Sequence, residues 1–442
     1  MNKYVKCRKA LAVCLGLLAA GAVQAQTAAL EHELEELFLQ ADRSNATLQS
    51  MRSAITVADA GIESARMQKL PEISGTASVS YLGNARLWNR HFRESTSAPM
   101  PHYGNNFSLR AEQVLYTGGA IKGAIELSRQ GAQMTRLSAA DEQQRVRFAL
   151  VGLYLQLHSL SNQERVYAKN REQANEQIRL MQNRREQGVS LRNDVTRYEL
   201  QLQQITLGET SVKDQQSIVR KQLLTALGND SSSIALLDES AFSVDGINAG
   251  GEATWQQLAQ TNHLGLQQSE LNVDMSRTKE KIERAARLPK FAVIAEDHLD
   301  GPITIEVPPI NKNLNYWYVG VGLSYNFSSL FKAKRKIKEA ALTTAHAADQ
   351  LTAARQGVSD AVHAAYVNLQ TAQTQLATCE KSVQLATENY DVVSNRYKNG
   401  LAIVTDLTDA ANMKLDAQLA LVNARINVAY TFYNLKYVTA SL

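Results

Sequence analysis

Apolar residues recur in alternating steps of four and three along a stretch near the end of the chain. The positions are Val358, Val362, Ala365, Leu369, Ala372, Leu376, Cys379, Val383, Ala386, Tyr390, Val393 and Tyr397. This spacing places the side chains on one stripe of an α-helix and is typical of a helix that packs along a partner helix. Cys379 occupies one of these positions, so the pattern predicts a small buried apolar side chain there and no redox role.

The same pattern occurs 212 residues earlier. The equivalent positions are Val146, Leu150, Leu153, Leu157, Leu160, Glu164, Tyr167, Arg171, Ala174, Ile178, Met181 and Arg185. Three of them carry a charge. The same offset pairs Gly188 with Gly400 and Asp194 with Asp406, so the sequence predicts an internal duplication.

The prolines indicate where long helices are allowed. All seven lie between residues 71 and 101 or between residues 289 and 309. Proline is costly inside a helix, and the stretches without it are rich in good helix formers. A first repeat over 26–228 should contain helices at about 30–68, 117–187 and 190–228. A Ser- and Gly-rich equatorial connector follows at 229–252. A second repeat over 253–442 should contain helices at 253–287, 329–399 and 403–440.

A different period appears around the prolines, where polar and apolar residues alternate one by one. Trp317, Val319 and Val321 fall on one face of an extended segment, and Gly320 and Gly322 fall on the other. Alternation of this kind is typical of a strand with two different faces. It predicts four strands, near 72–82, 106–116, 290–299 and 315–327, that form two β-hairpins over 72–116 and 290–327, with exposed loops between their strands.

Strands of about ten residues are long enough to cross a membrane when they are tilted. Four strands cannot close on themselves, and an open edge in lipid leaves backbone groups without partners. The pattern therefore predicts that several chains share one barrel, unless the four strands form a soluble sheet that caps the helices. In either case the predicted fold is mainly α with a small β part.

The first 25 residues have the pattern of a secretory signal. Lys3, Lys6, Arg8 and Lys9 precede an apolar run at 10–23, and we expect cleavage before Gln26. An uncleaved anchor, or acylation at Cys7 or Cys14, is the alternative. The formal charge of +4 belongs to the signal, so the mature chain has no net charge and gives no indication of nucleic-acid binding. Only Cys379 remains after cleavage, which excludes a disulfide framework.

Catalytic and ligand-binding patterns are missing from the sequence. The eight histidines are scattered without the spacing of a metal site and without a partnered nucleophile, and the glycines form no phosphate-binding loop. We therefore expect no enzyme activity, no cofactor and no metal site.

The repeated turn carries a family resemblance. Residues 184–195 and 396–407 each contain a glycine, five further residues, an aspartate and an apolar residue. With the signal and the repeated order of helix, hairpin, long helix and return helix, this plan resembles the TolC family of outer-membrane efflux proteins over the whole mature chain. The resemblance implies a homotrimer whose twelve strands form one β-barrel in the outer membrane of a Gram-negative bacterium, continued by an α-barrel of long helical hairpins in the periplasm.

The resemblance also implies a function and partners. Such a subunit conducts substrates passively in a tripartite efflux or type I secretion system, together with a periplasmic adaptor protein and an inner-membrane transporter of RND or ABC type. The alternative is a periplasmic adaptor or structural coiled-coil protein. An adaptor would lack the paired amphipathic hairpins and would stay soluble, whereas a barrel subunit would fractionate with membrane lipid.

The candidate site residues lie at the two turns. Asp406 and Asp409 share one helix face, and in the family such a pair lines the pore constriction; an ordinary acidic first turn is the other interpretation. Gly188 and Gly400 form the tips, and Asp194 and Tyr397 match residues that tether the closed state in the family. Ala402 departs from the family, since several relatives carry a basic residue there, so closure here could use Arg192 or Lys398 instead.

Overall fold

The computed structural model describes residues 30–188, 191–228, 234, 251–306 and 309–442. The expected signal at 1–25 and most of the expected connector at 229–252 lie outside these residues. The chain divides into two compact units, one made of Met1–Ser53, Leu137–Gln267 and Thr352–Leu442, the other of Ala54–Arg136 and Gln268–Leu351. The first unit contains the hairpin turns, and the second contains the sheet.

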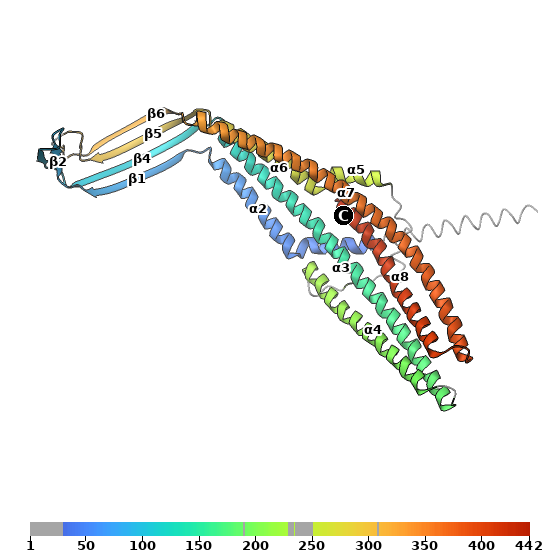
Figure 1. The fold of residues 1–442 in the computed structure, drawn as a ribbon. Helices are drawn as coiled ribbons and strands as arrows, with labels where there is room; N and C mark the ends of the chain where they lie inside the picture. Colours follow the sequence, from blue (N-terminus) through green and yellow to red (C-terminus); the bar gives the residue numbers. More distant parts are fainter. Residues whose placement is uncertain (1–29, 189–190, 229–233, 235–250, 307–308) are drawn as a thin grey trace, which may run out of the picture. The chain divides into compact units, whose positions relative to one another are not determined.

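Helices make up most of the described chain, as Figure 1 shows. The two longest are α3 (Ala120–Glu186) and α7 (Ser329–Lys398), and each is followed by a return helix, α4 (Arg192–Leu227) or α8 (Val404–Val438). The predicted fold class, mainly α with a small β part, is confirmed. Among the helices that the structure describes, none is long and apolar enough to span a membrane.

Two helices that we expected to be continuous are interrupted, so these predictions were wrong. The expected helix at 30–68 ends at residue 44 and resumes as α2 (Ala46–Met67), because the Asn45 side chain accepts the N–H groups of Thr47 and Leu48 at 2.9 and 3.1 Å and so caps a new helix. The expected helix at 253–287 is α5 (Glu252–Asn262) followed by α6 (Leu264–Ala285). At the junction, Nδ1 of His263 accepts a hydrogen bond from the backbone N–H of Leu266 at 3.3 Å.

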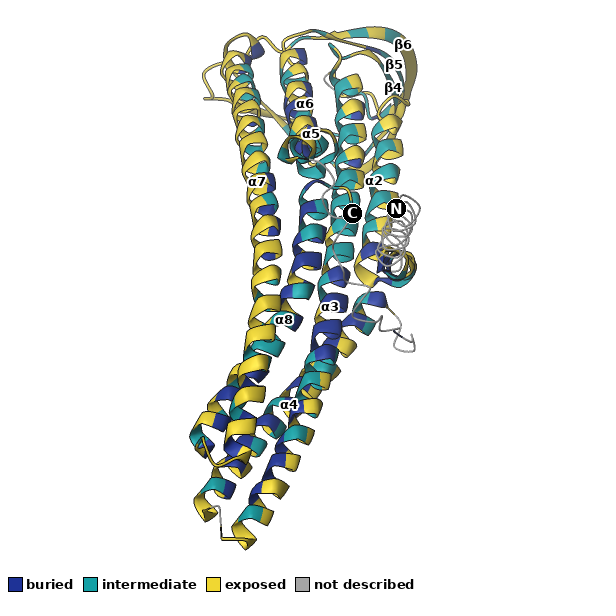
Figure 2. Cartoon of the chain, turned by 90° about the vertical axis from the view of Figure 1, so that its right-hand side faces the viewer, coloured by how far each residue is buried: buried dark blue, intermediate teal, exposed yellow. Residues whose placement is uncertain are grey.

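The predicted apolar stripe of α7 is the side of the helix that packs. Every one of its twelve positions is buried or half-buried, while most of the other residues of the helix are exposed (Figure 2). In α3 the equivalent positions behave in the same way, except that Arg171 and Arg185 are exposed. Apolar clusters formed by these stripes hold α3, α4, α7 and α8 together within the first unit.

The four predicted strands form one antiparallel sheet in the second unit. They are β1 (Glu72–Tyr81), β4 (Tyr103–Tyr116), β5 (Lys290–Gly301) and β6 (Leu314–Ser324), in the order β1-β4-β5-β6. Pairing of β4 with β5 joins the two hairpins, and β1 and β6 form the edges. A small extra hairpin, β2 (Ala85–Trp88) and β3 (Ser95–Ala98), lies in the segment that we expected to be an exposed loop.

The strand register separates the sheet into two different faces. One face is mostly apolar and carries Ile73, Ala77, Val79, Phe107, Leu109, Phe291, Val293, Trp317, Val319, Val321 and Leu323. The opposite face carries Ser74, Thr76, Ser78, Asn106, Ser108, Arg110, Glu296, His298 and Tyr318. Asp297 is an exception on the apolar face, where it accepts a hydrogen bond from Asn315 at 3.0 Å. The apolar face suits lipid, and the polar face suits water.

Candidate functional site at the hairpin tips

A glycine with a left-handed backbone ends each long helix. Gly188 and Gly400 have φ angles of +74° and +72°. At the second tip, the N–H of Gly400 donates to Tyr397 at 3.0 Å and the N–H of Leu401 donates to Arg396 at 2.8 Å, which is the usual closure of a helix C-terminus. A Cβ atom would meet nothing within 4 Å at either glycine, so the backbone angle, not space, requires glycine here.

The two repeated aspartates perform the same local task. Oδ2 of Asp194 accepts the N–H of Leu191 at 3.1 Å, and Oδ2 of Asp406 accepts the N–H of Ile403 at 3.4 Å. Each carboxylate thereby satisfies an N–H at the start of its return helix. Asp406 therefore has the role of an acidic first turn, which was one of the two interpretations from the sequence. It is exposed nevertheless, as is Asp409 three residues later.

A shared apolar core lies behind the two tips and draws on all four helices. It contains Ala174, Ile178, Met181, Val195, Tyr198, Ile205, Tyr390, Tyr397, Val404, Leu407, Ala410 and Leu415, with Ala402 packed at its edge. Burial raises the pKa of Tyr198 and, with smaller opposing effects from hydrogen bonds, that of Tyr390. The two hydroxyl groups are hydrogen-bonded to each other and stay neutral within the core.

Polar side chains link the first hairpin, α3 and α4, to the second, α7 and α8. Such hydrogen bonds between the hairpins include Arg197 to Thr405 at 3.3 Å, Gln201 to Asn412 at 3.0 Å, Asn170 to Gln418 at 2.9 Å and Ser159 to Asn423 at 3.0 Å. Their partners lie more than 200 positions apart in the sequence, so periodicity alone gave no signal for them.

Lys414 is a buried cation in this part of the molecule. Its Nζ atom lies 4.4 Å from the ring centre of Tyr390 and 3.5 Å from Oε1 of Gln173. Burial lowers the pKa of its ammonium group. Lys414 was not predicted from the sequence, because neighbouring residues on a helix do not share a face and its position next to the core residue Leu415 gives no signal of burial.

Arg184 is the second residue that the sequence analysis missed. Its Nη1 atom donates to the carbonyl oxygens of Tyr397 and Lys398 at 2.9 and 3.0 Å, and its Cζ atom lies 5.3 Å from the ring centre of Tyr397. From the sequence we expected Tyr397 and Asp194 each to match a residue of the family's closed-state tether; within the single chain, the structure places Arg184 against Tyr397. A weak signal existed, because an arginine recurs at the equivalent position, Arg396.

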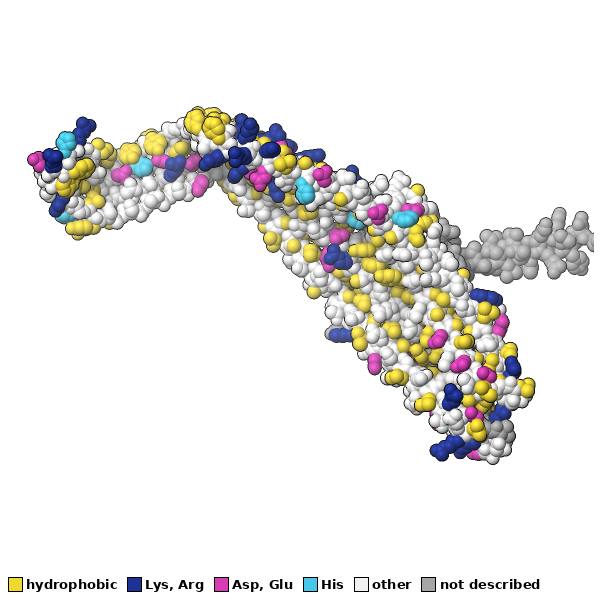
Figure 3. Space-filling model, viewed as in Figure 1, with side chains coloured by type: hydrophobic (Ala, Val, Ile, Leu, Met, Phe, Trp, Pro, Cys, Tyr) yellow, Lys and Arg dark blue, Asp and Glu magenta, His cyan; other side chains and the backbone are white. Residues whose placement is uncertain are grey.

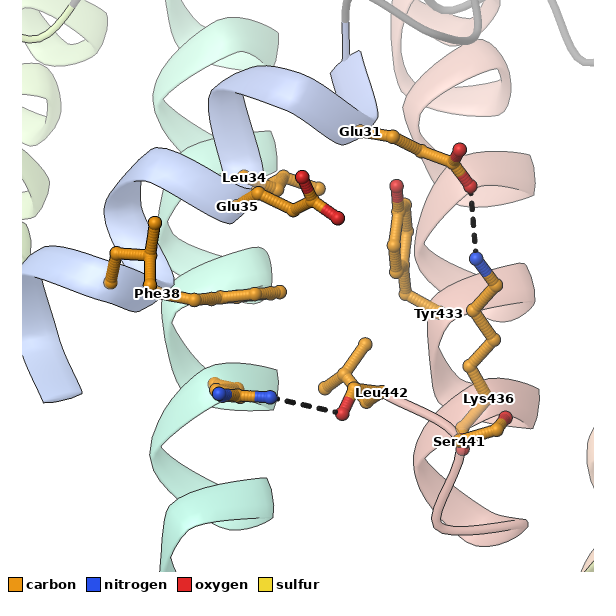
Figure 4. A pocket seen from close by; sticks show the side chains of 10 residues that line it. Glu31, Leu34, Glu35, Phe38, Tyr433, Lys436, Ser441 and Leu442 are labelled. Carbon is orange, nitrogen blue, oxygen red and sulfur yellow. Dashed lines mark hydrogen bonds and ion pairs between the residues drawn. The ribbon is translucent and has the colours of Figure 1, made fainter.

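A cavity of about 500 Å³ lies elsewhere in the first unit, between residues 30–44, α3 and α8 (Figure 4). Three of its charged groups have partners in the fold: Glu31 pairs with Lys436 at 3.0 Å, and Arg147 pairs with Asp42 at 2.7 Å and donates to the carbonyl oxygen of Leu442 at 3.3 Å. None of the predicted site residues lines it. The cavity therefore gives no reason to move the candidate site away from the tips.

A family model and two curated relatives match almost the whole chain. The family model described as outer membrane efflux protein matches residues 37–229 and 255–440. The outer membrane protein TolC of Salmonella enteritidis is 21% identical over 440 residues, which covers 98% of this chain and 87% of TolC. The outer membrane efflux protein BepC of Brucella suis biovar 1 (strain 1330) is 21% identical over 433 residues, or 97% of this chain and 90% of BepC.

Solved structures agree at the level of the fold. The outer-membrane channel OprN superimposes with a TM-score of 0.76 at 15% identity, covering 93% of this chain and 90% of OprN. The family match extends over most of the chain, and its members are passive channels of the outer membrane and not enzymes. The chain therefore belongs to the outer membrane efflux protein family, the TolC-like channels of efflux systems.

Proposed function

We propose that three copies of this chain form one duct, which conducts cargo passively from an inner-membrane transporter of RND or ABC type and its periplasmic adaptor. Asp406 and Asp409 line the constriction of this duct at the tip of α7 and α8. Gly188, Gly400, Asp194, Tyr397 and Ala402 shape the surrounding turns. In this proposal the inner-membrane partner supplies the energy, and this chain supplies a water-filled path.

The edges of the sheet support a shared barrel. In the part of the chain that the structure describes, strands β1 and β6 each have a neighbouring strand on one side only. Unpaired backbone groups are very costly in hydrocarbon, and membrane barrels start at about eight strands. If β6 of one copy pairs with β1 of the next, three copies give twelve strands, no open edge and a continuous apolar outer face.

The observation that carries the proposed constriction is the exposure of two carboxylates on one face of the first turns of α8. Asp406 is held in place by the N–H of Ile403, and Asp409 follows on the same face. Threefold symmetry would bring six carboxylates together at one level. Rings of aspartate attract cations and are a common basis of cation selectivity.

Single-channel recording of the purified protein in planar bilayers tests this proposal. Asp406→Asn combined with Asp409→Asn should lower the cation-to-anion permeability ratio and weaken block by divalent cations. Asp214→Asn is the matched control, since it removes an exposed carboxylate from α4 at a distance from the tip. Unaltered selectivity in the double variant would remove both residues from the constriction, and wild-type protein that forms no channels would contradict the duct itself.

A further inference from the structure

We infer that the exposed face of the first turns of α7 binds the headgroups of anionic phospholipids in the membrane that the strands cross. This part of α7 carries a basic cluster, which consists of Lys332, Lys334, Arg335, Lys336 and Lys338, all of them exposed. The inference rests on the part of the proposed function that places the strands in the outer membrane. It does not depend on the constriction at the tips.

The fold itself does not account for the basic cluster. In the part of the chain that the structure describes, none of its five side chains forms an ion pair, and neither does the nearby carboxylate of Glu339. Like charges three or four positions apart on a helix repel each other, and Lys334 and Lys338 have this spacing. The first turn of α7 contains no acidic residue, although the helix dipole favours one there. The cluster therefore opposes the stability of the helix and indicates a partner outside the fold.

The first repeat shows that a long helix can follow a strand without such a cluster. At the offset of 212, the equivalent residues 120–126 of α3 contain one cation, Lys122, and one carboxylate, Glu126. Strands β4 and β6 run in the same direction, so α3 and α7 begin at the same end of the sheet. The basic cluster is therefore a property of α7 and not a requirement of the repeated plan.

Exposed aromatic side chains accompany the cluster. Phe327, in the link before α7, and Phe331 are 73% and 81% exposed. Phe331, Arg335 and Lys338 follow one another in steps of four and three, so they share one face of the helix. Ala333, on the opposite side, is buried. Figure 3 shows Lys and Arg side chains beside hydrophobic ones where the strands give way to the helices. Cations next to exposed rings suit a lipid, in which a phosphate group adjoins acyl chains.

The cluster also lies at the depth of lipid headgroups. Residues 325–328 alone separate the end of β6 from the start of α7, and the apolar face of β6 continues to Leu323. A helix rises by about 1.5 Å per residue, so Lys338 lies at most about 14 Å beyond Ser329. Lysine and arginine side chains are long enough to reach the headgroup layer from there. The partner that fits both charge and position is an anionic phospholipid of the leaflet on the helical side of the sheet.

Lipid binding to the detergent-solubilised oligomer tests this assignment. Fluorescent phosphatidylglycerol is titrated onto the purified protein in a neutral detergent, and phosphatidylcholine with the same labelled acyl chains is the reference. Wild type should prefer phosphatidylglycerol, and added salt should reduce the preference. A triple variant, Lys334→Gln with Arg335→Gln and Lys338→Gln, should bind phosphatidylglycerol about 100-fold more weakly, or about fivefold for each cation. Its binding of phosphatidylcholine should stay unchanged.

A second triple variant is the matched control. Lys169→Gln with Arg179→Gln and Arg220→Gln removes three exposed cations from α3 and α4, far along the chain from the sheet, and should bind both lipids as wild type does. Both triple variants are first checked as heat-modifiable oligomers, which shows that they have folded and assembled.

Several outcomes would overturn the assignment. Equal binding of the two lipids by wild type, or an equal loss in both triple variants, would show that this face does not recognise anionic lipid. Wild-type affinity in the α7 variant would remove the basic cluster from the site. If the α7 variant alone fails to assemble, the face is a contact between copies and the assignment is wrong. The binding assay measures no conduction, so each of these results leaves the duct standing, whereas wild-type protein recovered outside the outer membrane would contradict the proposed function itself.

Discussion

His158 shows how a single buried side chain links stability to pH. It is 1% exposed and its ring lies against Tyr154, with ring centres 4.8 Å apart. Burial, assisted by the charge of Arg165, lowers the pKa of His158 to about 4 from the ordinary 6.5. The unfolded chain therefore takes up a proton near pH 6.5, whereas the folded chain resists protonation until about pH 4. The contribution of neutral His158 to the stability of the fold is therefore complete above pH 6.5 and is lost as the pH falls towards 4.

We predict that the free energy of unfolding falls by about 3 kcal/mol between pH 6.5 and pH 4 through His158 alone. His158→Gln should flatten this part of the curve of melting temperature against pH, measured on detergent-solubilised protein. The exposed His346→Gln is the control and should leave the curve unchanged. Parallel curves for wild type and His158→Gln would show that His158 does not titrate in this range.

Single residues differ in how far the sequence reveals them. The pairing of Gly188 with Gly400 and of Asp194 with Asp406 follows from the repeat, because each performs a local task that its own turn defines. The repeat marked Arg184 only weakly, through Arg396, and its contacts could not be predicted because the acceptors lie 213 and 214 positions away. A sequence pattern predicts which face of a helix packs, but not which ends of two hairpins meet.

The sequence predicted the long helices but not the breaks within the shorter ones. Long stretches without proline predicted α3 and α7 well, because local propensity and periodicity agree there. The breaks at Asn45 and His263 were missed, since neither position carries proline or glycine. Asn45 also donates to the carbonyl oxygen of Ala226 at 2.8 Å. This contact is with a distant segment, so the local sequence could not predict it.

Two of the three charged interruptions in the α3 stripe, Glu164 and Arg171, are explained by its partner helix. Glu209 of α4 is buried and pairs with Arg171 at 3.0 Å and Lys213 at 2.7 Å, while Glu164 accepts from Gln216 at 2.8 Å. In the second repeat the residues equivalent to Glu164, Arg171 and Glu209 are Leu376, Val383 and Leu421. One hairpin therefore uses an ionic network where the other uses apolar contacts.

This network leads to a prediction about the first hairpin. Glu209→Gln removes the charge that Arg171 and Lys213 share, and it should destabilise the protein by about 1–2 kcal/mol. The loss stays moderate because both cations are about half exposed, at 44% and 50%, and recover water. Chemical unfolding followed by circular dichroism measures it. Glu199→Gln, at an exposed position of α4, should cost little, and an equal loss at both positions would contradict a specific network.

Hydrophobic side chains of the sheet are exposed in the single chain. Figure 3 shows Lys, Arg, Asp and Glu side chains over the helices and also along the strands, where hydrophobic side chains are visible beside them. The apolar residues of the sheet are exposed in the single chain, for example Val79 at 74% and Val321 at 74%. An exposed apolar face on an antiparallel sheet with two free edges is expected of a strand set that meets lipid and neighbouring copies.

A matched pair on β1 tests this orientation. Ala77 lies on the apolar face, paired with Phe107, and Ser78 lies on the opposite face, paired with Asn106. An arginine facing lipid near the middle of a membrane strand costs about 2–4 kcal/mol, whereas the same residue facing water is tolerated. Ala77→Arg should therefore reduce the amount of heat-modifiable oligomer in outer-membrane fractions, and Ser78→Arg should assemble normally with altered ion selectivity.

If the two variants assemble equally well, the apolar face does not meet lipid. If their effects are reversed, the two faces of the sheet have been assigned the wrong way round. Because the residues are neighbours on one strand, strand propensity and depth are nearly the same, and the difference between the variants reports the face alone.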